Sequence, residues 1–246
     1  MPAKQRLDQM LVDRGLVESR AKAQALVLAG KVFSGERKLD KPGTQLKPET
    51  PLEVRGKDHP WVSRGGLKLA HAVEAFGLSP DGAVCIDVGA STGGFTDVLL
   101  THGAARVYAV DVGHGQLAWR LRQDERVVVL EKTNARRLNA ERIPEPVDWV
   151  VCDASFIGLA TVLPAALALA RPGATLAALI KPQFEAGREH VGKGGVVRNP
   201  DVHQAVCERV CLWLDGEGWA VQGIVESPIK GPEGNVEFLL VAHRSP

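Results

Sequence analysis

Residues 86–95 have the sequence Ile86-Asp87-Val88-Gly89-Ala90-Ser91-Thr92-Gly93-Gly94-Phe95. An apolar run from Ala83 leads into them and predicts a buried strand, and residues 95–102 have the composition of the start of a helix. A strand, a glycine turn and a helix in this order bring backbone amides close to the positive end of a helix dipole. The stretch therefore predicts a site for an adenosine-containing cofactor.

A second apolar run, residues 106–110, ends at Asp111, 22 residues after Gly89. In doubly wound α/β folds, an acidic residue at about this offset binds the ribose hydroxyls. The turn lacks the Gly-x-Gly-x-x-Gly spacing that accommodates a pyrophosphate, because Ala90 and Ser91 follow Gly89. S-adenosylmethionine, which has no pyrophosphate, therefore fits better than NAD. A turn that only links strand to helix is the alternative.

The charge of the 246-residue chain is unevenly distributed. Residues 1–57 hold 12 Lys and Arg against 7 Asp and Glu, a net +5, whereas residues 58–246 hold 18 against 22, a net −4. We expect a small basic domain at 1–57, a linker at 58–62 and a larger, mildly acidic domain at 63–246.

Several classes of protein are disfavoured by the composition. The longest apolar tract, residues 159–180, is interrupted by Pro164 and Pro172, so it predicts a helix, a turn and a strand and no membrane span. Residues 1–7 carry charge but no apolar core follows them, so we expect no signal peptide. The cysteines form no Cys-x-x-Cys pair and have no histidine at metal-ligand spacing: Cys85, Cys152, Cys207 and Cys211. We expect a cytoplasmic monomer with reduced thiols, no metal and no membrane partner.

The larger domain has the pattern of a parallel sheet. Five apolar runs alternate with helical segments, at 83–88, 106–111, 127–130, 147–153 and 174–181. Two further strands, 219–226 and 235–243, are separated by a link too short for a crossover helix, so they form a hairpin and the last strand is antiparallel. The expected fold is α/β, a Rossmann-like methyltransferase sheet with a terminal antiparallel strand, preceded by a small α+β domain.

Charged residues gather at one edge of this predicted sheet. The carboxyl ends of the parallel strands and the start of the antiparallel strand lie at the same edge, where ligands bind. Five charged residues lie there: Asp87, Asp111, Asp153, Lys181 and Glu237. Charges at the ends of apolar strands are costly unless they are paired or solvated, so this set predicts a functional site.

The basic domain has two predicted helices, at 6–14 and 19–29, followed by short strands. Its candidate phosphate-binding residues lie on or beside these helices: Arg6, Arg14, Arg20, Lys22 and Lys31. An ordinary solvated face is the alternative. The segments Arg6-Leu7-Asp8, Ser19-Arg20-Ala21-Lys22-Ala23 and Ala29-Gly30-Lys31-Val32 resemble the RNA-binding domain named after the fourth protein of the small ribosomal subunit. This resemblance favours structured RNA as the partner.

The larger domain resembles FtsJ-like RNA 2′-O-methyltransferases. Four segments carry the resemblance: Trp61-Val62-Ser63-Arg64-Gly65-Gly66-Leu67-Lys68-Leu69, Cys152-Asp153-Ala154-Ser155-Phe156, Ile180-Lys181-Pro182-Gln183-Phe184-Glu185 and Gly234-Asn235-Val236-Glu237. The whole arrangement resembles the TlyA family, whose members are named both hemolysin A and rRNA (cytidine-2′-O)-methyltransferase. The resemblance implies a catalytic set of Lys68, Asp153, Lys181 and Glu237.

The implied reaction is methyl transfer from S-adenosylmethionine to the ribose 2′-hydroxyl of a cytidine in ribosomal RNA. Lys181 would remove the hydroxyl proton as a neutral base, or orient the oxygen as a cation. Both roles stay open, since Lys68 favours the neutral amine and the carboxylates favour the charged one. Arg64 joins the RNA-binding set. The expected cofactor contacts are Asp87, Gly89, Ala90, Ser91, Thr92, Gly93, Gly94, Phe95, Asp111, Asn134 and Asp153.

Two alternatives differ in class. One is a non-catalytic RNA-binding or ribosome-assembly factor that keeps the cofactor fold. The other is a membrane-active hemolysin, which the lack of a basic amphipathic helix disfavours. The glycine-rich segment 187–195, with Arg188 and Lys193 and followed by Arg198, is either a loop that orders over RNA or a plain linker.

Overall fold

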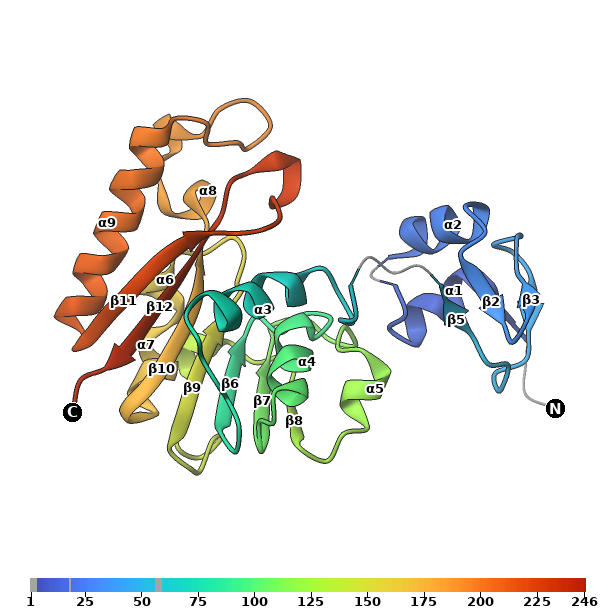
Figure 1. Cartoon of the computed structure of the whole chain (residues 1–246), viewed down its shortest axis with the longest axis horizontal. Helices are drawn as coiled ribbons and strands as arrows, with labels where there is room; N and C mark the ends of the chain where they lie inside the picture. The colour runs from blue at the N-terminus through green and yellow to red at the C-terminus, as the bar shows by residue number, and fades with distance from the viewer. Residues whose placement is uncertain (1–3, 18, 56–58) are drawn as a thin grey trace.

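The computed structural model describes residues 4–17, 19–55 and 59–246, and Figure 1 shows a small N-terminal domain beside a larger α/β domain. The predicted boundary between residues 57 and 58 lies outside the described residues. The two domains touch where Gly15 meets Ala118. A Cβ atom at Gly15 would lie 2.6 Å from the Ala118 Cβ, so this contact has no room for a larger residue.

The N-terminal domain is a helix pair packed on two small sheets. Its helices are α1 (Leu7–Asp13) and α2 (Arg20–Leu28), and its strands are β1 (Gln5–Arg6), β2 (Val32–Ser34), β3 (Arg37–Lys38), β4 (Gln45–Leu46) and β5 (Glu53–Val54). The sheet orders are β1-β4 and β3-β2-β5. Leu7, Leu11 and Val27 of the helices pack against Val32 to form the core. The side chain of Ser19 accepts a hydrogen bond from the Lys22 amide and caps α2, as its position at the start of the helix predicts.

The larger domain contains seven strands in the order β11-β12-β10-β9-β6-β7-β8. Their bounds are β6 (Val84–Val88), β7 (Arg106–Val110), β8 (Val127–Leu130), β9 (Val147–Cys152), β10 (Ala170–Ile180), β11 (Trp219–Glu226) and β12 (Phe238–Arg244). Strands β6 to β10 pair in parallel, as their alternation with helices predicts.

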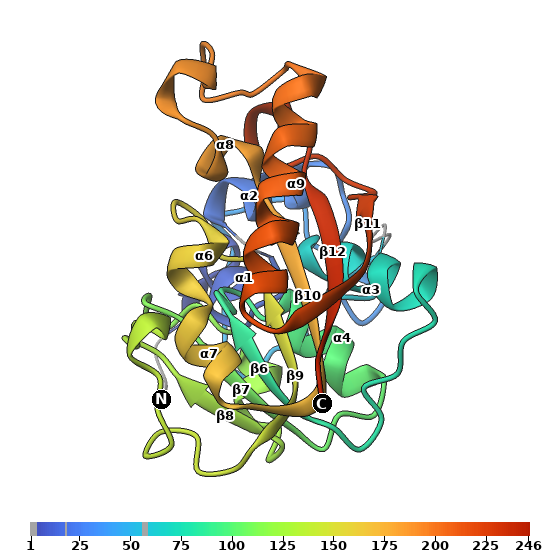
Figure 2. The same ribbon diagram turned by 90° about the vertical axis from the view of Figure 1, so that its left-hand side faces the viewer.

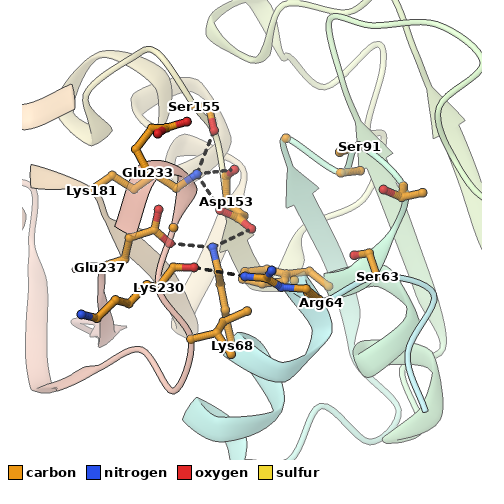
Figure 3. A pocket seen from close by; sticks show the side chains of 18 residues that line it. Ser63, Arg64, Lys68, Ser91, Asp153, Ser155, Lys181, Lys230, Glu233 and Glu237 are labelled. Atoms are coloured by element: carbon orange, nitrogen blue, oxygen red, sulfur yellow. Dashed lines mark hydrogen bonds and ion pairs between the residues drawn. The ribbon is translucent and has the colours of Figure 1, made fainter. Parts of the chain in front are cut away.

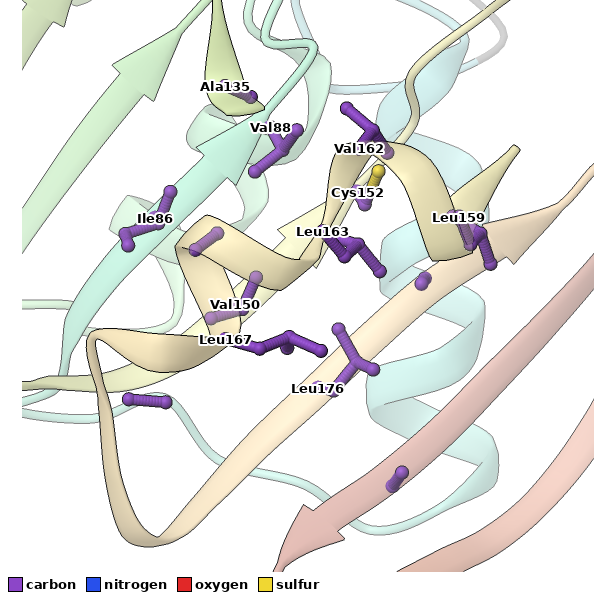
Figure 4. Packing of buried hydrophobic residues seen from close by; sticks show 14 of the residues in the cluster. Ile86, Val88, Ala135, Val150, Cys152, Leu159, Val162, Leu163, Leu167 and Leu176 are labelled. Carbon is purple, nitrogen blue, oxygen red and sulfur yellow. The ribbon is translucent and has the colours of Figure 1, made fainter. Parts of the chain in front are cut away.

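Helices cover both faces of this sheet (Figure 2). They are α3 (Gly65–Ala75), α4 (Gly94–Thr101), α5 (Trp119–Arg122), α6 (Leu159–Val162), α7 (Pro164–Ala168), α8 (Pro182–Glu185) and α9 (Pro200–Gly216), with single 3₁₀ turns η1 (Ala135–Arg137), η2 (Arg188–His190) and η3 (Pro232–Gly234). Side chains alternate along each strand, so Ile86 and Val150 meet α6 and α7 (Figure 4). Cys85 and Val151 belong to the core under α3, α4 and α5 on the other face. Burial on both faces explains why the strand sequences are continuous apolar runs.

Strand β12 is antiparallel, as expected, but it is not at the edge of the sheet. It lies between β10 and β11 and pairs antiparallel with both. This position sets the start of β12 beside the end of β10, because Phe238 is registered with Ile180. Glu237 and Lys181 are the next residues at these two ends, so the register brings them to the same edge.

Among the described residues, no helix is long and apolar enough to cross a membrane, and no cluster of three or more His, Cys, Asp or Glu side chains is arranged to hold a metal ion. All four cysteine thiols are free, and burial raises the pKa of Cys152 to about 12.

Candidate active site

Two adjoining cavities open at the carboxyl edge of the sheet. The first, of about 570 Å³, is lined by the start of α3, the 89–95 turn, the ends of β9 and β10 and the loop before β12. The second, of about 500 Å³, is lined by residues after β6, β7, β8 and β9. Gly89, Ser91, Asp153 and Ser155 line both. The predicted edge is therefore a pair of connected cavities.

Four charged side chains meet in the first cavity, although they come from four separate elements (Figure 3). The Nζ of Lys68 lies 2.6 Å from Oε2 of Glu237 and 3.6 Å from Oδ2 of Asp153. The Nζ of Lys181 lies 2.7 Å from Oδ1 of Asp153, an ion pair without hydrogen-bond geometry. Asp153 therefore bridges the two lysines, and three ion pairs join the four residues predicted as a catalytic set into one chain.

Three of these four charged side chains are buried. Glu237 is 1% exposed, Lys68 8% and Lys181 6%. Each buried charge has an opposite charge beside it, which compensates its loss of hydration. Lys181 also donates hydrogen bonds to the carbonyl oxygen of Asp153 at 3.1 Å and to Oγ of Ser155 at 2.9 Å.

The glycines of the 89–95 turn are required mainly by the protein's own packing. Gly89 and Gly93 have φ values of 81° and 96°, which other residues rarely adopt. A Cβ at Gly89 would lie 2.9 Å from Cα of Ala154, and one at Gly94 would lie 2.4 Å from Oγ of Ser63. These glycines therefore allow neighbouring parts of the chain to approach the turn, and close approach of a ligand to the same turn stays a prediction. The turn still lines the first cavity at every position except Gly93.

Asp87 lies beneath the turn and lines neither cavity, unlike the other predicted cofactor contacts at the ends of strands. It is fully buried, and its Oδ2 accepts hydrogen bonds from the amide and hydroxyl of Thr96, at 3.0 and 2.7 Å. Its Oδ1 has no hydrogen-bond partner among the described residues. Burial raises the pKa of Asp87 to about 7. Its role in this structure is to hold the first turn of α4.

Asp111 and Asn134 line the second cavity. Asp111 Oδ2 accepts a hydrogen bond from the Ser91 amide at 2.8 Å, and Oδ1 accepts one from the Gly113 amide at 2.7 Å. Each carboxylate oxygen has a further lone pair for a ligand. Asn134 caps η1 by accepting from the Arg136 amide at 3.1 Å, so it is a turn residue as well as a cavity residue.

Comparison with known proteins agrees with this geometry. The profile described as FtsJ-like methyltransferase matches residues 61–244, and the profile of the S4 domain matches residues 5–51. The Mycobacterium tuberculosis protein named 16S/23S rRNA (cytidine-2′-O)-methyltransferase TlyA is 50% identical over 241 residues, covering 98% of this chain and 90% of that protein. The chain belongs to the TlyA family. It is a methyltransferase with an N-terminal S4 domain.

Other TlyA-like proteins carry the older name. Hemolysin A of Brachyspira hyodysenteriae is 41% identical, covering 95% of this chain and 98% of that protein. A solved structure named "Putative hemolysin from Streptococcus thermophilus" is 42% identical and superposes with a TM-score of 0.76, covering 100% of this chain and 90% of that one.

The basic residues of the S4 domain in this TlyA family member divide into two groups. Arg6 and Arg20 donate to the buried carboxylate of Asp8, and the Arg6 guanidinium holds the pKa of Asp8 well below its usual range. Both arginines remain about half exposed. Arg14 donates to the carbonyl oxygens of Thr50 and Pro48. Structural roles therefore accompany any RNA contact by these three.

The other predicted RNA-binding residues are placed differently. Lys22 is exposed, and Lys31 is half-buried. Arg64 lies far from the S4 sheets, at the first cavity, where its Nη2 donates to the carbonyl oxygen of Lys230 at 3.2 Å.

Several cavity residues are not among those predicted from the sequence, and three of them bear on the site. Ser155 contacts Lys181, Lys230 lies at the rim of the first cavity, and Phe156 is 90% exposed beside the second with a φ of 66°. Ser155 and Phe156 belong to the segment that carries the FtsJ resemblance, so their adjacency to Asp153 was the available signal. Nothing in the sequence marked Lys230.

Proposed function

We propose that this TlyA family member transfers a methyl group from S-adenosylmethionine to the ribose 2′-hydroxyl of a cytidine in ribosomal RNA, and that it acts in the cytoplasm. The observation that carries the proposal is the contact of Lys68, Asp153, Lys181 and Glu237 in a cavity that also contains the 89–95 turn. The relative from M. tuberculosis is named for this activity on 16S and 23S rRNA.

The residues of the two cavities fit the cofactor. The second cavity has an apolar floor of Val88, Val110 and Val162, and Asp111 stands at its side. These are the groups that an adenine ring and a ribose diol require. The 89–95 turn lies between this cavity and the charged set. S-adenosylmethionine, when bound, supplies an electrophilic methyl group.

Lys181 is the residue that acts on the acceptor hydroxyl. Its Nζ donates hydrogen bonds to the carbonyl oxygen of Asp153 and to Oγ of Ser155, and it forms an ion pair with Oδ1 of Asp153. An ammonium has three N–H donors, so the third N–H is available to the 2′ oxygen of the acceptor while both hydrogen bonds are kept.

Lys181 either accepts the hydroxyl proton as a neutral amine or orients the oxygen as a cation. In both cases it aligns the nucleophile for in-line attack, and Asp153 fixes the direction of its amine. Lys68 and Glu237 form the opposite wall of the cavity and position the acceptor ribose.

The decisive experiment incubates the protein with radiolabelled S-adenosylmethionine and unmodified small and large ribosomal subunits, followed by mapping of the labelled ribose. Label on a cytidine 2′ oxygen is expected, and no label in either subunit or in naked rRNA would refute the proposal. Lys181→Ala is expected to lower the transfer rate about 10²- to 10⁴-fold while rRNA binding is kept. If wild type binds rRNA but transfers no methyl group, the chain is instead a non-catalytic RNA-binding factor.

A further inference from the structure

Two loops lie side by side above the carboxyl edge of the sheet, next to the first cavity. They are residues 187–198, which include η2, and residues 227–237, which include η3, and Figures 1 and 2 show them beside one another. We call them the paired loops. The catalytic argument uses only Glu237, the last residue of the second loop.

The paired loops are joined by a buried asparagine. Asn235 is 3% exposed, its Oδ1 accepts from the Val197 amide at 3.2 Å, and its Nδ2 donates to the Gly195 carbonyl oxygen at 3.0 Å. Val196 and Val197 are also buried, which anchors the first loop by its apolar end. The glycine-rich segment is therefore held to the active-site wall and is not a plain linker.

The exposed surface of the paired loops carries unneutralised positive charge. Among the described residues, no acidic group lies within 4.0 Å of the cationic atoms of four exposed side chains: Arg188, Lys193, Arg198 and Lys230. Arginines at the opposite edge of the sheet differ. Arg106 pairs with Glu145, and Arg171 pairs with Asp148.

Two acidic residues reduce this positive charge. Glu189 lies 3.5 Å from His190, and Glu233 is exposed at the rim of the first cavity. With four cations against two anions, the surface stays net positive. Neither loop contains Phe, Tyr or Trp, so stacking on bases has no residue to provide it.

We propose that the paired loops bind the phosphates of the rRNA segment that flanks the target ribose. This inference rests on the proposed function and extends it, because it adds a second RNA surface separate from the S4 domain. The hydrogen bond from Arg64 to the Lys230 carbonyl oxygen extends this surface across the first cavity to α3. Phosphates held on both sides of the cavity fix the backbone of the nucleotide between them, so that its 2′ oxygen faces Lys181.

The test measures the affinity of the full-length protein for transcribed 16S and 23S rRNA as a function of salt. Arg188→Gln/Lys193→Gln is expected to weaken binding about tenfold for each phosphate contact at about 0.1 M salt, and to reduce the slope of log K against log salt by about one per contact. Arg171→Gln removes the same kind of charge at the opposite edge of the sheet and is expected to leave both quantities unchanged. The Kd for S-adenosylmethionine is measured in parallel.

Glu233→Gln separates electrostatics from misfolding, since removal of an anion from the surface is expected to tighten rRNA binding two- to fivefold, roughly one weak charge contact. Loss of structure cannot produce that gain. Unchanged affinity and salt slope in Arg188→Gln/Lys193→Gln, with methyl transfer by wild type intact, would overturn this inference alone. Absence of methyl transfer by wild type would instead overturn the proposed function.

Discussion

Replacing the residues of the Lys68–Glu237 ion pair tests how much each buried charge depends on the other for the stability of the folded protein. Replacing each residue with methionine removes one charge while keeping an unbranched side chain of similar length. In Lys68→Met, the one side-chain partner that Glu237 keeps among the described residues is the Gln183 amide, 3.4 Å from its Oε1. In Glu237→Met, Lys68 keeps Asp153 at 3.6 Å. Glu237 in Lys68→Met is therefore less well compensated by neighbouring groups than Lys68 in Glu237→Met.

The magnitude follows from burial. Truncating one partner of a buried pair costs about 3–5 kcal/mol, and Glu237 at 1% exposure belongs in that range. We expect Lys68→Met to lower the free energy of unfolding by about 3–4 kcal/mol and Glu237→Met by about 2, because Asp153 compensates Lys68. The double variant is expected to lose only about 1 kcal/mol, since two apolar side chains then pack against each other.

Urea unfolding followed by tryptophan fluorescence measures these differences. All five tryptophans lie after residue 58, so the signal reports the methyltransferase domain and not the S4 domain. The losses of unfolding free energy in the two single variants, added together, should exceed the loss in the double variant by about 4 kcal/mol. All three variants should lose methyl transfer. Additive losses would refute the reasoning, because they would show that the two charges do not compensate each other in the folded protein.

Three further changes test other parts of the structure. Asp87→Asn should abolish a pH dependence of stability. Burial raises the folded-state pKa of Asp87 from 3.8 to about 7, so its contribution to wild-type stability is present below about pH 4 and falls by up to about 4 kcal/mol as the pH rises to 7. In urea unfolding at pH 5 and pH 8, the free energy of unfolding of the variant should therefore rise relative to that of wild type, and a constant difference would contradict this. Gly94→Ala places a Cβ 2.8 Å from the Gly66 amide nitrogen, so it should lower the free energy of unfolding by about 1–3 kcal/mol and weaken S-adenosylmethionine binding. Thermal unfolding measures the first effect and calorimetry the second, and wild-type values in both would count against the packing role of this glycine. Ser155→Ala should lower kcat about three- to tenfold with little change in the KM for rRNA, roughly the effect of one hydrogen bond. Ser155→Thr should keep the wild-type kcat, and Ser79→Ala, on an exposed loop before β6, should have no effect. An unchanged kcat in Ser155→Ala would remove Ser155 from the mechanism.

The fold was predictable from the sequence because most of its parallel strands are clear apolar runs with well-defined ends. Strands β6, β7 and β9 are short, largely buried apolar runs, and the edge strand β8 is a partly buried apolar run. Each of the four strands is followed by a polar residue or a glycine, and their predicted and observed limits agree within one residue. The position of β12 was not predictable. A hairpin of β11 and β12 is compatible with either strand next to β10, and only the packing of Leu239 and Val241 against α3 and β10 selects β12.

The active site was predictable in part from topology, which places Asp153, Lys181 and Glu237 at one edge of the sheet, whereas Lys68 was identified only through family resemblance. Lys68 and Glu237 are 169 residues apart, and no local spacing relates them. The glycine turn was located correctly, but its packing against Ala154 and Ser63 was not predicted from the sequence. Ser155 and Lys230 contribute through tertiary contacts that leave no pattern along the chain.

The inner position of β12 has a consequence for synthesis of the protein on the ribosome. Strands β10 and β11 emerge first, but in the folded sheet they do not pair with each other, because β12 lies between them and pairs with both. Until residues 238–244 have left the exit tunnel, the nascent sheet has an open apolar edge at β10, and Glu237 has no fixed position opposite Lys68. Methyltransferase activity should therefore appear only after β12 has left the exit tunnel, and a ribosome stalled before that point would hold a nascent chain that is inactive and prone to aggregate.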